Sequence, residues 1–226
     1  MCRMTKPLWY NPGSIVPPAK GMVDMAMAPD RLPTVVPADW VPGPKQGQWT
    51  YQSYAHLPDD GNRYEIVNGV LFMSPSPNIP HQRIAGRFFR YLSAYIEDAG
   101  LGIVLMAPSD VELSAKNVLQ PDVFVVLNAG LKKVKESHVV GAPDLVIEIA
   151  SPSTAIHDRN RKYHLYAQAG VPEYWIAEPA SKTVEVLVLE SGEYRSLGIF
   201  RGKASLPSQI VPDIKAVPVE RFFVQA

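Results

Sequence analysis

Apolar positions recur at helical spacing in one segment of the chain. In residues 79–99, Ile84, Phe88, Leu92 and Ile96 follow one another at intervals of four, which places them on one face of a helix. Gly100 follows where a helix of this kind ends. A second helix is predicted over 158–169, where Gly170 again marks the end.

The other apolar runs have the length and composition of strands. Asn68 and Gly69 separate two of them, 63–67 and 70–73, and this dipeptide predicts a hairpin because both turn positions need positive φ. Further strands are predicted at 103–107, 111–113, 123–127, 144–150, 173–177, 183–189 and 194–200. The run 144–150 is apolar on both faces, which is typical of a covered central strand, and the last three alternate as in an antiparallel meander. The pattern predicts an α/β (α+β) protein with a mixed sheet and helices packed on it.

In residues 1–46 the apolar residues show neither helical nor strand-like spacing. Nine of the 22 prolines lie there, and proline at that density blocks helices and central strands. The sequence therefore predicts a flexible proline-rich arm over residues 1–46 and one folded domain over 47–226.

Composition narrows the class of protein. The 22 basic residues balance the 22 acidic ones, which disfavours bulk coating of nucleic acid but leaves a local binding groove open. Cys2 is the single cysteine, so an intramolecular disulfide and a cysteine metal site are both excluded. Without a long apolar run or a secretory signal, the chain is expected to be cytoplasmic and not to contact a membrane.

Three ionisable residues suggest chemistry. Glu148 lies inside the apolar strand, where a carboxylate is costly to bury unless a cation meets it, and either a structural salt bridge or a metal ion would do so. Asp122 opens a strand after proline, a position that also suits a turn residue. Lys162 lies on the next helix and taken alone reads as a solvated charge.

Together the three residues point to phosphodiester hydrolysis. Two carboxylates on neighbouring strands are hard oxygen ligands for Mg²⁺ or Mn²⁺. Such an ion lowers the pKa of its bound water, and a lysine nearby stabilises developing negative charge. Asp122, Glu148 and Lys162 are therefore the predicted catalytic core.

A set of motifs across residues 50–200 resembles the Uma-type family of putative restriction endonucleases, within the PD-(D/E)XK nuclease superfamily. The matching residues are Arg63-Tyr64-Glu65-Ile66-Val67-Asn68-Gly69, His81, Asp122, Glu148, Ser151-Pro152-Ser153, Lys162, Tyr166 and Gly170-Val171-Pro172-Glu173-Tyr174-Trp175. The resemblance implies a restriction-endonuclease-like core with an N-terminal hairpin and flanking helices. It also implies a metal held by Asp122, Glu148 and the carbonyl of Ile149. Position 150, where the superfamily has its acid-x-Lys lysine, is alanine here, which points to Lys162 from the following helix.

Accessory roles follow for three further residues. Glu65 either completes the metal shell and takes part in catalysis, or pairs with Arg63 or Lys162. His81 contacts phosphate, acts in proton transfer, or forms hydrogen bonds with the local backbone at the start of its helix. Tyr166 is a further accessory candidate through the resemblance.

The expected function is a divalent-metal-dependent DNA endonuclease. The alternatives are an inactive nuclease-fold interaction protein and an RNA-processing nuclease on the same scaffold. By analogy with the fold, a homodimer is expected, because two active sites can then cut two strands.

Overall fold

Twelve strands form two six-stranded sheets in the computed structural model, which describes residues 35–57, 60–74, 76–150, 157–211, 214 and 217–224, and only the backbone of 157–159. These residues belong to one unit, Leu32–Ala226. Within them no helix has the length and apolar content needed to span a bilayer.

The first sheet has the order β1-β3-β2-β6-β5-β8. Its strands are β1 (Val36–Pro37), β2 (Arg63–Val67), β3 (Val70–Ser74), β5 (Val111–Ser114), β6 (Asn117–Leu119) and β8 (Val139–Val140). The β2–β3 hairpin forms as predicted, because Asn68 and Gly69 both have positive φ, 51° and 74°. The helix α1 (Tyr51–Tyr54) packs beside this sheet through Tyr51 and Tyr54.

The second sheet has the order β12-β11-β10-β9-β7-β4. Its strands are β4 (Gly102–Met106), β7 (Val123–Leu127), β9 (Leu145–Ile149), β10 (Glu173–Glu178), β11 (Thr183–Glu190) and β12 (Glu193–Arg201). The strand β9 lies in the centre between antiparallel β7 and parallel β10, and β10, β11 and β12 form the predicted meander. The prediction of a mixed sheet with packed helices is therefore confirmed, although the strands divide into two sheets.

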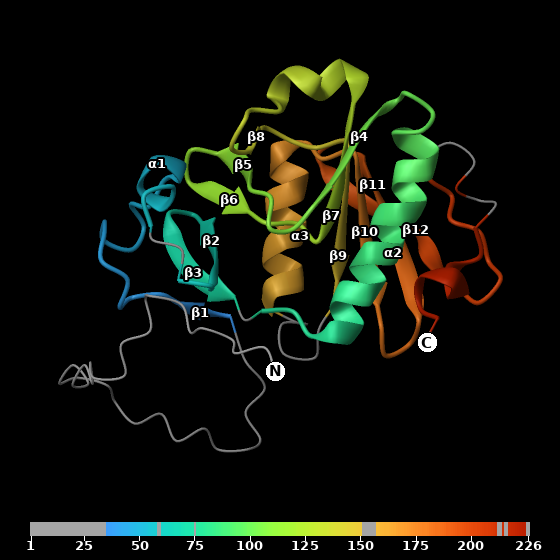
Figure 1. Ribbon diagram of the computed structural model, residues 1–226, viewed down its shortest axis with the longest axis horizontal. Helices are drawn as coiled ribbons and strands as arrows, with labels where there is room; N and C mark the ends of the chain where they lie inside the picture. The colour runs from blue at the N-terminus through green and yellow to red at the C-terminus, as the bar shows by residue number, and fades with distance from the viewer. Residues whose placement is uncertain are drawn as a thin grey trace, which may run out of the picture. The chain divides into compact units, whose positions relative to one another are not determined.

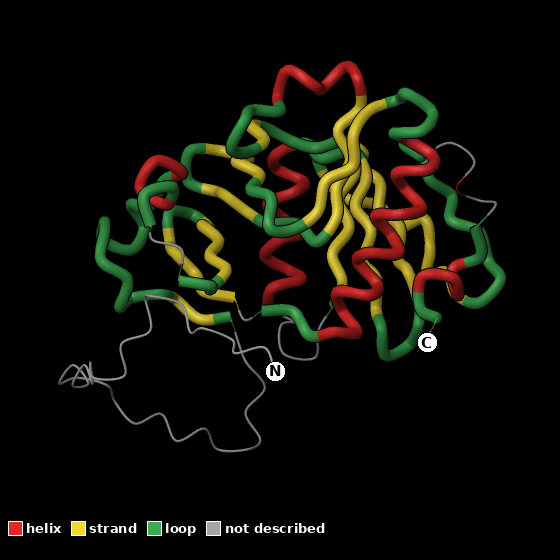
Figure 2. Tube along the Cα trace, in the orientation of Figure 1, coloured by secondary structure: helices red, strands yellow, loops and turns green. Residues whose placement is uncertain are grey.

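Two helices cover opposite faces of the second sheet (Figure 1). The helix α2 (Ile79–Ile96) buries Ile84, Phe88 and Leu92 against Leu145 and Ile147 of β9, so its apolar stripe meets one face of that strand. The helix α3 (His157–Ala169) packs Leu165 and Tyr166 on the other face. Because side chains alternate along a strand, Val146 and Glu148 point toward α3. Figure 2 shows α3 between the two sheets.

The described residues also include the 3-10 helices η1 (Asn128–Lys133), after β7, and η3 (Val219–Phe222), near the C-terminus. Phe222 of η3 stacks on Phe88 of α2 with ring centroids 4.1 Å apart. The C-terminal segment therefore closes the apolar layer over α2 rather than contributing to the α3 side.

The proline-rich region differs in part from its description as an arm. Val36 and Pro37 pair with β3, and Ala38 is fully buried and donates from its N–H to the carbonyl of Leu71. The predicted boundary at residue 46 thus falls within a segment that packs on the hairpin, because proline is compatible with a short edge strand. Residues 1–34 of the arm, like the motif residues Ser151–Ser153, lie outside the described residues.

Candidate functional site

The site forms where the chain passes from the first sheet to the second. Gln120 and Pro121 join β6 to β7, and Asp122 directly precedes β7. The antiparallel register pairs Val123 of β7 with Ile147 of β9. One residue further along, this register sets Asp122 opposite Glu148, at a separation where cross-strand side chains meet. Pro121 favours an extended backbone at Gln120, the residue before it, and this suits a direct connection from the first sheet to the second.

Lys162 joins the carboxylates of both sheets. Its ammonium lies 3.0 Å from Oε1 of Glu65 on β2 and 3.1 Å from Oε1 of Glu148 on β9. Its side chain is only 9% exposed, so the expectation that Lys162, taken alone, is a solvated charge on a helix is wrong. Of the two partners considered for Glu65, the structure selects Lys162, since Arg63 bonds elsewhere.

The pKa of Glu148 lies well above its usual value. Burial raises its pKa to about 7, the negative charges of Asp122 and Glu65 add to that rise, and Lys162 and the hydroxyl of Tyr166 oppose it. Tyr166 lies one helical turn after Lys162 and donates to Oε1 of Glu148 at 2.6 Å. The carboxylate is therefore held in place by two donors from α3, which only partly oppose the effect of burial on its pKa.

Asp122 is held by a separate set of donors. Its Oδ2 accepts from the backbone N–H of Ile149 at 2.8 Å and lies 3.1 Å from Nε2 of His81. Burial would raise the pKa of Asp122, but the hydrogen bond and charge of His81 outweigh it and lower the pKa. Burial likewise tends to lower the pKa of His81, and Asp122 reverses this and raises it. The two groups thus favour a charged pair.

His81 reaches this site from the first turn of α2. Its backbone N–H is capped by Asn78, whose side-chain oxygen accepts at 2.9 Å, while its ring extends to the site. Nε2 also lies 3.2 Å from the carbonyl oxygen of Ile149, and Nδ1 is buried without a hydrogen-bond partner among the described residues. The side chain of His81 therefore contacts Asp122 and Ile149 rather than the backbone at the start of α2.

Two residues at the site, Arg63 and Gln120, were not among the predicted site residues. The guanidinium of Arg63 donates to the side chain and the carbonyl of Gln120, and the N–H of Gln120 donates to Glu65 at 3.0 Å. Their signals were present in the sequence: Arg63 is two positions from Glu65 on the same strand face, and Gln120 precedes the Pro121-Asp122 pair.

The structure brings all the predicted site residues together. They are Glu65, His81, Asp122, Glu148, Ile149, Lys162 and Tyr166. Four elements and the strand-to-strand connection before β7 supply them, so the cluster exists only in the folded chain. The role of each in catalysis stays a prediction.

The donor set suits a hard divalent cation. Asp122, Glu148 and the carbonyl of Ile149 offer oxygen ligands. Burial raises the pKa of Glu148, and the charges of Asp122 and Glu65 add to the rise, so a bound cation would stabilise the charged form of Glu148. In the present conformation no three His, Cys, Asp or Glu side chains of the described residues are arranged to hold a metal. In this conformation the ammonium of Lys162 lies against oxygens of Glu65 and Glu148, and the ring of His81 lies against Asp122.

Comparisons with known proteins give a family match and a similar fold. Residues 51–220 match the model of the Uma2 family, described as putative restriction endonucleases. The fold is similar to that of a solved structure described as a putative nuclease belonging to DUF820 from Anabaena variabilis, with a TM-score of 0.63 and 17% identity over 77% of this chain and 97% of the other. No curated protein matches the chain significantly. The family match covers the whole site, from Glu65 to Tyr166.

Proposed function

Since the chain belongs to the Uma2 family of putative restriction endonucleases, we propose that it is an endonuclease that hydrolyses phosphodiester bonds in DNA with a divalent metal ion, Mg²⁺ or Mn²⁺. The resemblance noted from the sequence motifs is confirmed by this family match. The metal, the substrate and the residue roles are the parts that the proposal adds.

One observation carries the proposal: three carboxylates lie together at the junction of the two sheets, two of them paired with Lys162 and the third with His81. Glu65 is 4% exposed and Asp122 is 6% exposed, while Glu148 is half-buried. Burying three acids together is costly, and a purely structural role could be filled by apolar side chains of similar size. A site of this composition suits a reaction that needs a cation and an activated water more than a covalent nucleophile.

Asp122 and Glu148, with the carbonyl of Ile149, would hold the metal ion. When bound, the ion supplies a hydroxide-like water at neutral pH and offsets charge on a phosphoryl oxygen. Lys162 has its ammonium fixed by Glu65 and Glu148, so it is placed to orient the attacking water and to stabilise charge that develops on the phosphate. Tyr166 keeps Glu148 oriented, and Glu65 keeps Lys162 charged.

His81 is the residue placed for proton transfer. Its ring contacts Asp122 and the carbonyl of Ile149, which are proposed to hold the cation. The position of the ring would therefore depend on whether the cation is bound. Homodimeric assembly and a cytoplasmic location belong to the same proposal. A dimer would bring two such sites to the two strands of a duplex.

The test is cleavage of supercoiled plasmid DNA by the purified chain with Mg²⁺, with Mn²⁺ and with EDTA. Glu148→Gln removes the charge at the site and keeps the shape of the side chain. Glu193→Gln, at the exposed start of β12, is the matched control. We expect nicking by wild type and by the control in either metal, and no nicking with EDTA or by Glu148→Gln.

An RNA of the same sequence, incubated in parallel, tests the substrate. If the RNA is cleaved and the DNA is not, the substrate is RNA and the protein is still a nuclease. Equal cleavage by wild type and Glu148→Gln would assign the activity to a contaminant. No cleavage of either nucleic acid would favour an interaction protein that keeps the fold.

A further inference from the structure

Arg63 is a cation fixed at the edge of the carboxylate cluster. It lies two residues before Glu65 on β2, so the two side chains leave the same face of the strand, toward Asp122 and Lys162. The first sheet thus supplies one positive and one negative group to a site whose other acids belong to the second sheet.

Two hydrogen bonds hold the guanidinium in a single orientation. Nε of Arg63 donates to Oε1 of Gln120 at 3.1 Å, and Nη2 donates to the backbone carbonyl of Gln120 at 2.9 Å. The planar fork of arginine turns these two bonds into a fixed direction for its remaining edge, which a flexible lysine would not provide.

The side chain of Gln120 is itself fixed. Its Nε2 donates to Oδ1 of Asp110 at 2.8 Å and to the hydroxyl of Tyr54 at 3.0 Å. Asp110 in turn accepts from Tyr54 at 3.1 Å. With the amide nitrogen committed to these acceptors, the amide oxygen must face Arg63. The orientation of the guanidinium therefore rests on a network of polar side chains behind it.

The edge of Arg63 left free by Gln120 faces the cluster. Nη1 lies 4.0 Å from Oδ1 of Asp122, too far for a hydrogen bond, and it donates to no other part of the described chain. A structural arginine–carboxylate pair would form two short bonds. The Arg63 side chain is 18% exposed against 7% for Asp122, so solvent reaches the cation more readily than the acid beside it.

We propose that Arg63 binds a non-bridging oxygen of the phosphate that is hydrolysed, with Gln120 as the residue that positions it. This inference rests on the proposed nuclease function and names a substrate contact within it. The phosphate is an anion that must approach three carboxylates, and a preorganised guanidinium at their edge offsets that repulsion without changing its own geometry.

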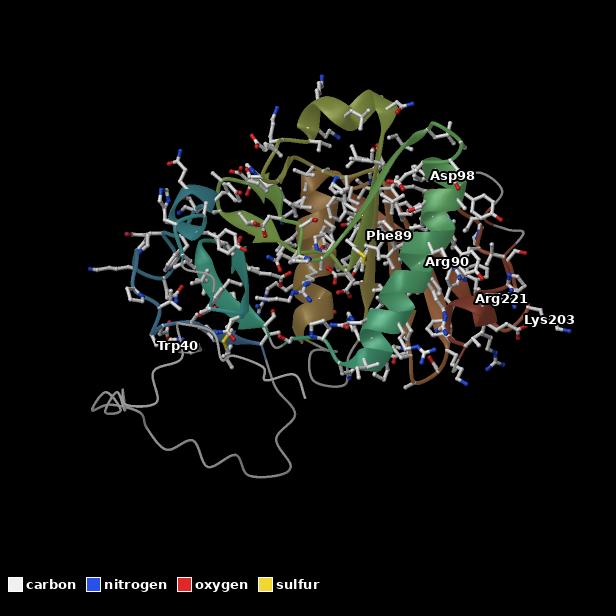
Figure 3. The ribbon with its side chains drawn as sticks, in the orientation of Figure 1. Trp40, Phe89, Arg90, Asp98, Lys203 and Arg221 are labelled. Atoms are coloured by element: carbon white, nitrogen blue, oxygen red, sulfur yellow. The ribbon has the colours of Figure 1, made fainter. Side chains whose placement is uncertain are left out.

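The experiment compares wild type, Arg63→Met, Arg63→Lys, Gln120→Met and Arg90→Met. Arg90 is an exposed arginine on α2 and is the charge-matched control (Figure 3). Folding of each variant is checked by thermal unfolding. A DNA duplex is used whose cut position has been mapped with wild type, and binding is measured in EDTA by fluorescence anisotropy over a range of salt concentrations.

For Arg63→Met we expect binding about tenfold weaker and a salt slope smaller by about one, as for the loss of one phosphate contact. Arg63→Lys and Gln120→Met should bind nearly as wild type but cut slowly, because the charge remains and its orientation is lost. Arg90→Met should leave cleavage unchanged.

A methylphosphonate at the cut position completes the test, since it removes the charged oxygen from that phosphate. It should weaken wild-type binding but not binding by Arg63→Met, so that the two changes are not additive. Additive effects, or coupling only to a neighbouring phosphate, would overturn the assignment while wild-type cleavage still supports the nuclease. Failure of wild type to cut any nucleic acid would remove the proposed function together with this contact.

Discussion

The ammonium of Lys162 lies 3.0 Å from a carboxylate oxygen of Glu65, a residue 97 positions earlier in the chain. This ion pair links α3 to the first sheet, and the contact of Lys162 with Glu148 links α3 to the second. The proposed catalytic lysine is thus also part of what holds the two sheets at their junction.

Lys162→Ala should destabilise the protein by about 3–5 kcal/mol, because it leaves Glu65 and Glu148 buried without this cation. Lys203→Ala, at an exposed lysine, should change stability by no more than about 0.5 kcal/mol. Urea unfolding followed by circular dichroism gives both values. Adding Glu65→Gln to Lys162→Ala should recover part of the loss. A Lys162→Ala variant as stable as wild type would mean that the ion pair has no net structural effect.

Glu148 should make the metal-free protein less stable as the pH rises from about 4.5 to about 7. The folded protein keeps a proton on Glu148 up to about pH 7, whereas the unfolded chain releases it near 4.5, so the folded state binds more protons in this range. The contribution is on the order of 3 kcal/mol across the range. Glu148→Gln removes it. The difference in unfolding free energy between variant and wild type should therefore grow with pH over this window, and a constant difference would contradict the raised pKa.

Tyr166→Phe should move the acidic limb of the cleavage rate to higher pH. The tyrosine hydroxyl lowers the pKa of Glu148 by hydrogen bonding to its charged form, so its loss raises that pKa. Tyr194→Phe is the control, because its hydroxyl donates to the carbonyl of Val171 at 2.8 Å, away from the carboxylates. Rates measured from pH 5 to 9 distinguish the two. If both variants keep the wild-type pH profile, Tyr166 serves stability alone.

Glu173 should be a structural residue, although it lies in a motif shared with the family. Its carboxylate is 1% exposed and accepts from Nε1 of Trp175 at 2.6 Å, from Oγ of Ser208 at 2.7 Å and from the N–H of Gln209 at 2.8 Å. Glu173→Ala leaves these donors without their acceptor and should cost about 2–4 kcal/mol. Cleavage per folded molecule should stay at the wild-type rate. A large fall in rate with unchanged stability would place Glu173 in the reaction.

Much of the fold could be predicted from local patterns. The hairpin at Asn68-Gly69 depends on two residues that adopt positive φ. The helix α2 depends on apolar spacing, and both α2 and α3 end near a glycine. Glu148 stood out because a carboxylate within an apolar strand needs a cation whatever surrounds the strand. These features follow from neighbours in sequence, and the structure shows each of them.

Other features depend on contacts between distant segments, and only the tertiary structure decided them. The division into two sheets could not be predicted, because strand pairing is set by packing across long separations rather than by the strands' own composition. The same holds for the partner of Glu65 and for the role of Gln120 as the residue that Arg63 and Glu65 share. The burial of Lys162 follows from this division as well. A lysine on a polar helix gives no local sign of burial, and it becomes a buried cation only because α3 lies between sheets that each present a carboxylate to it.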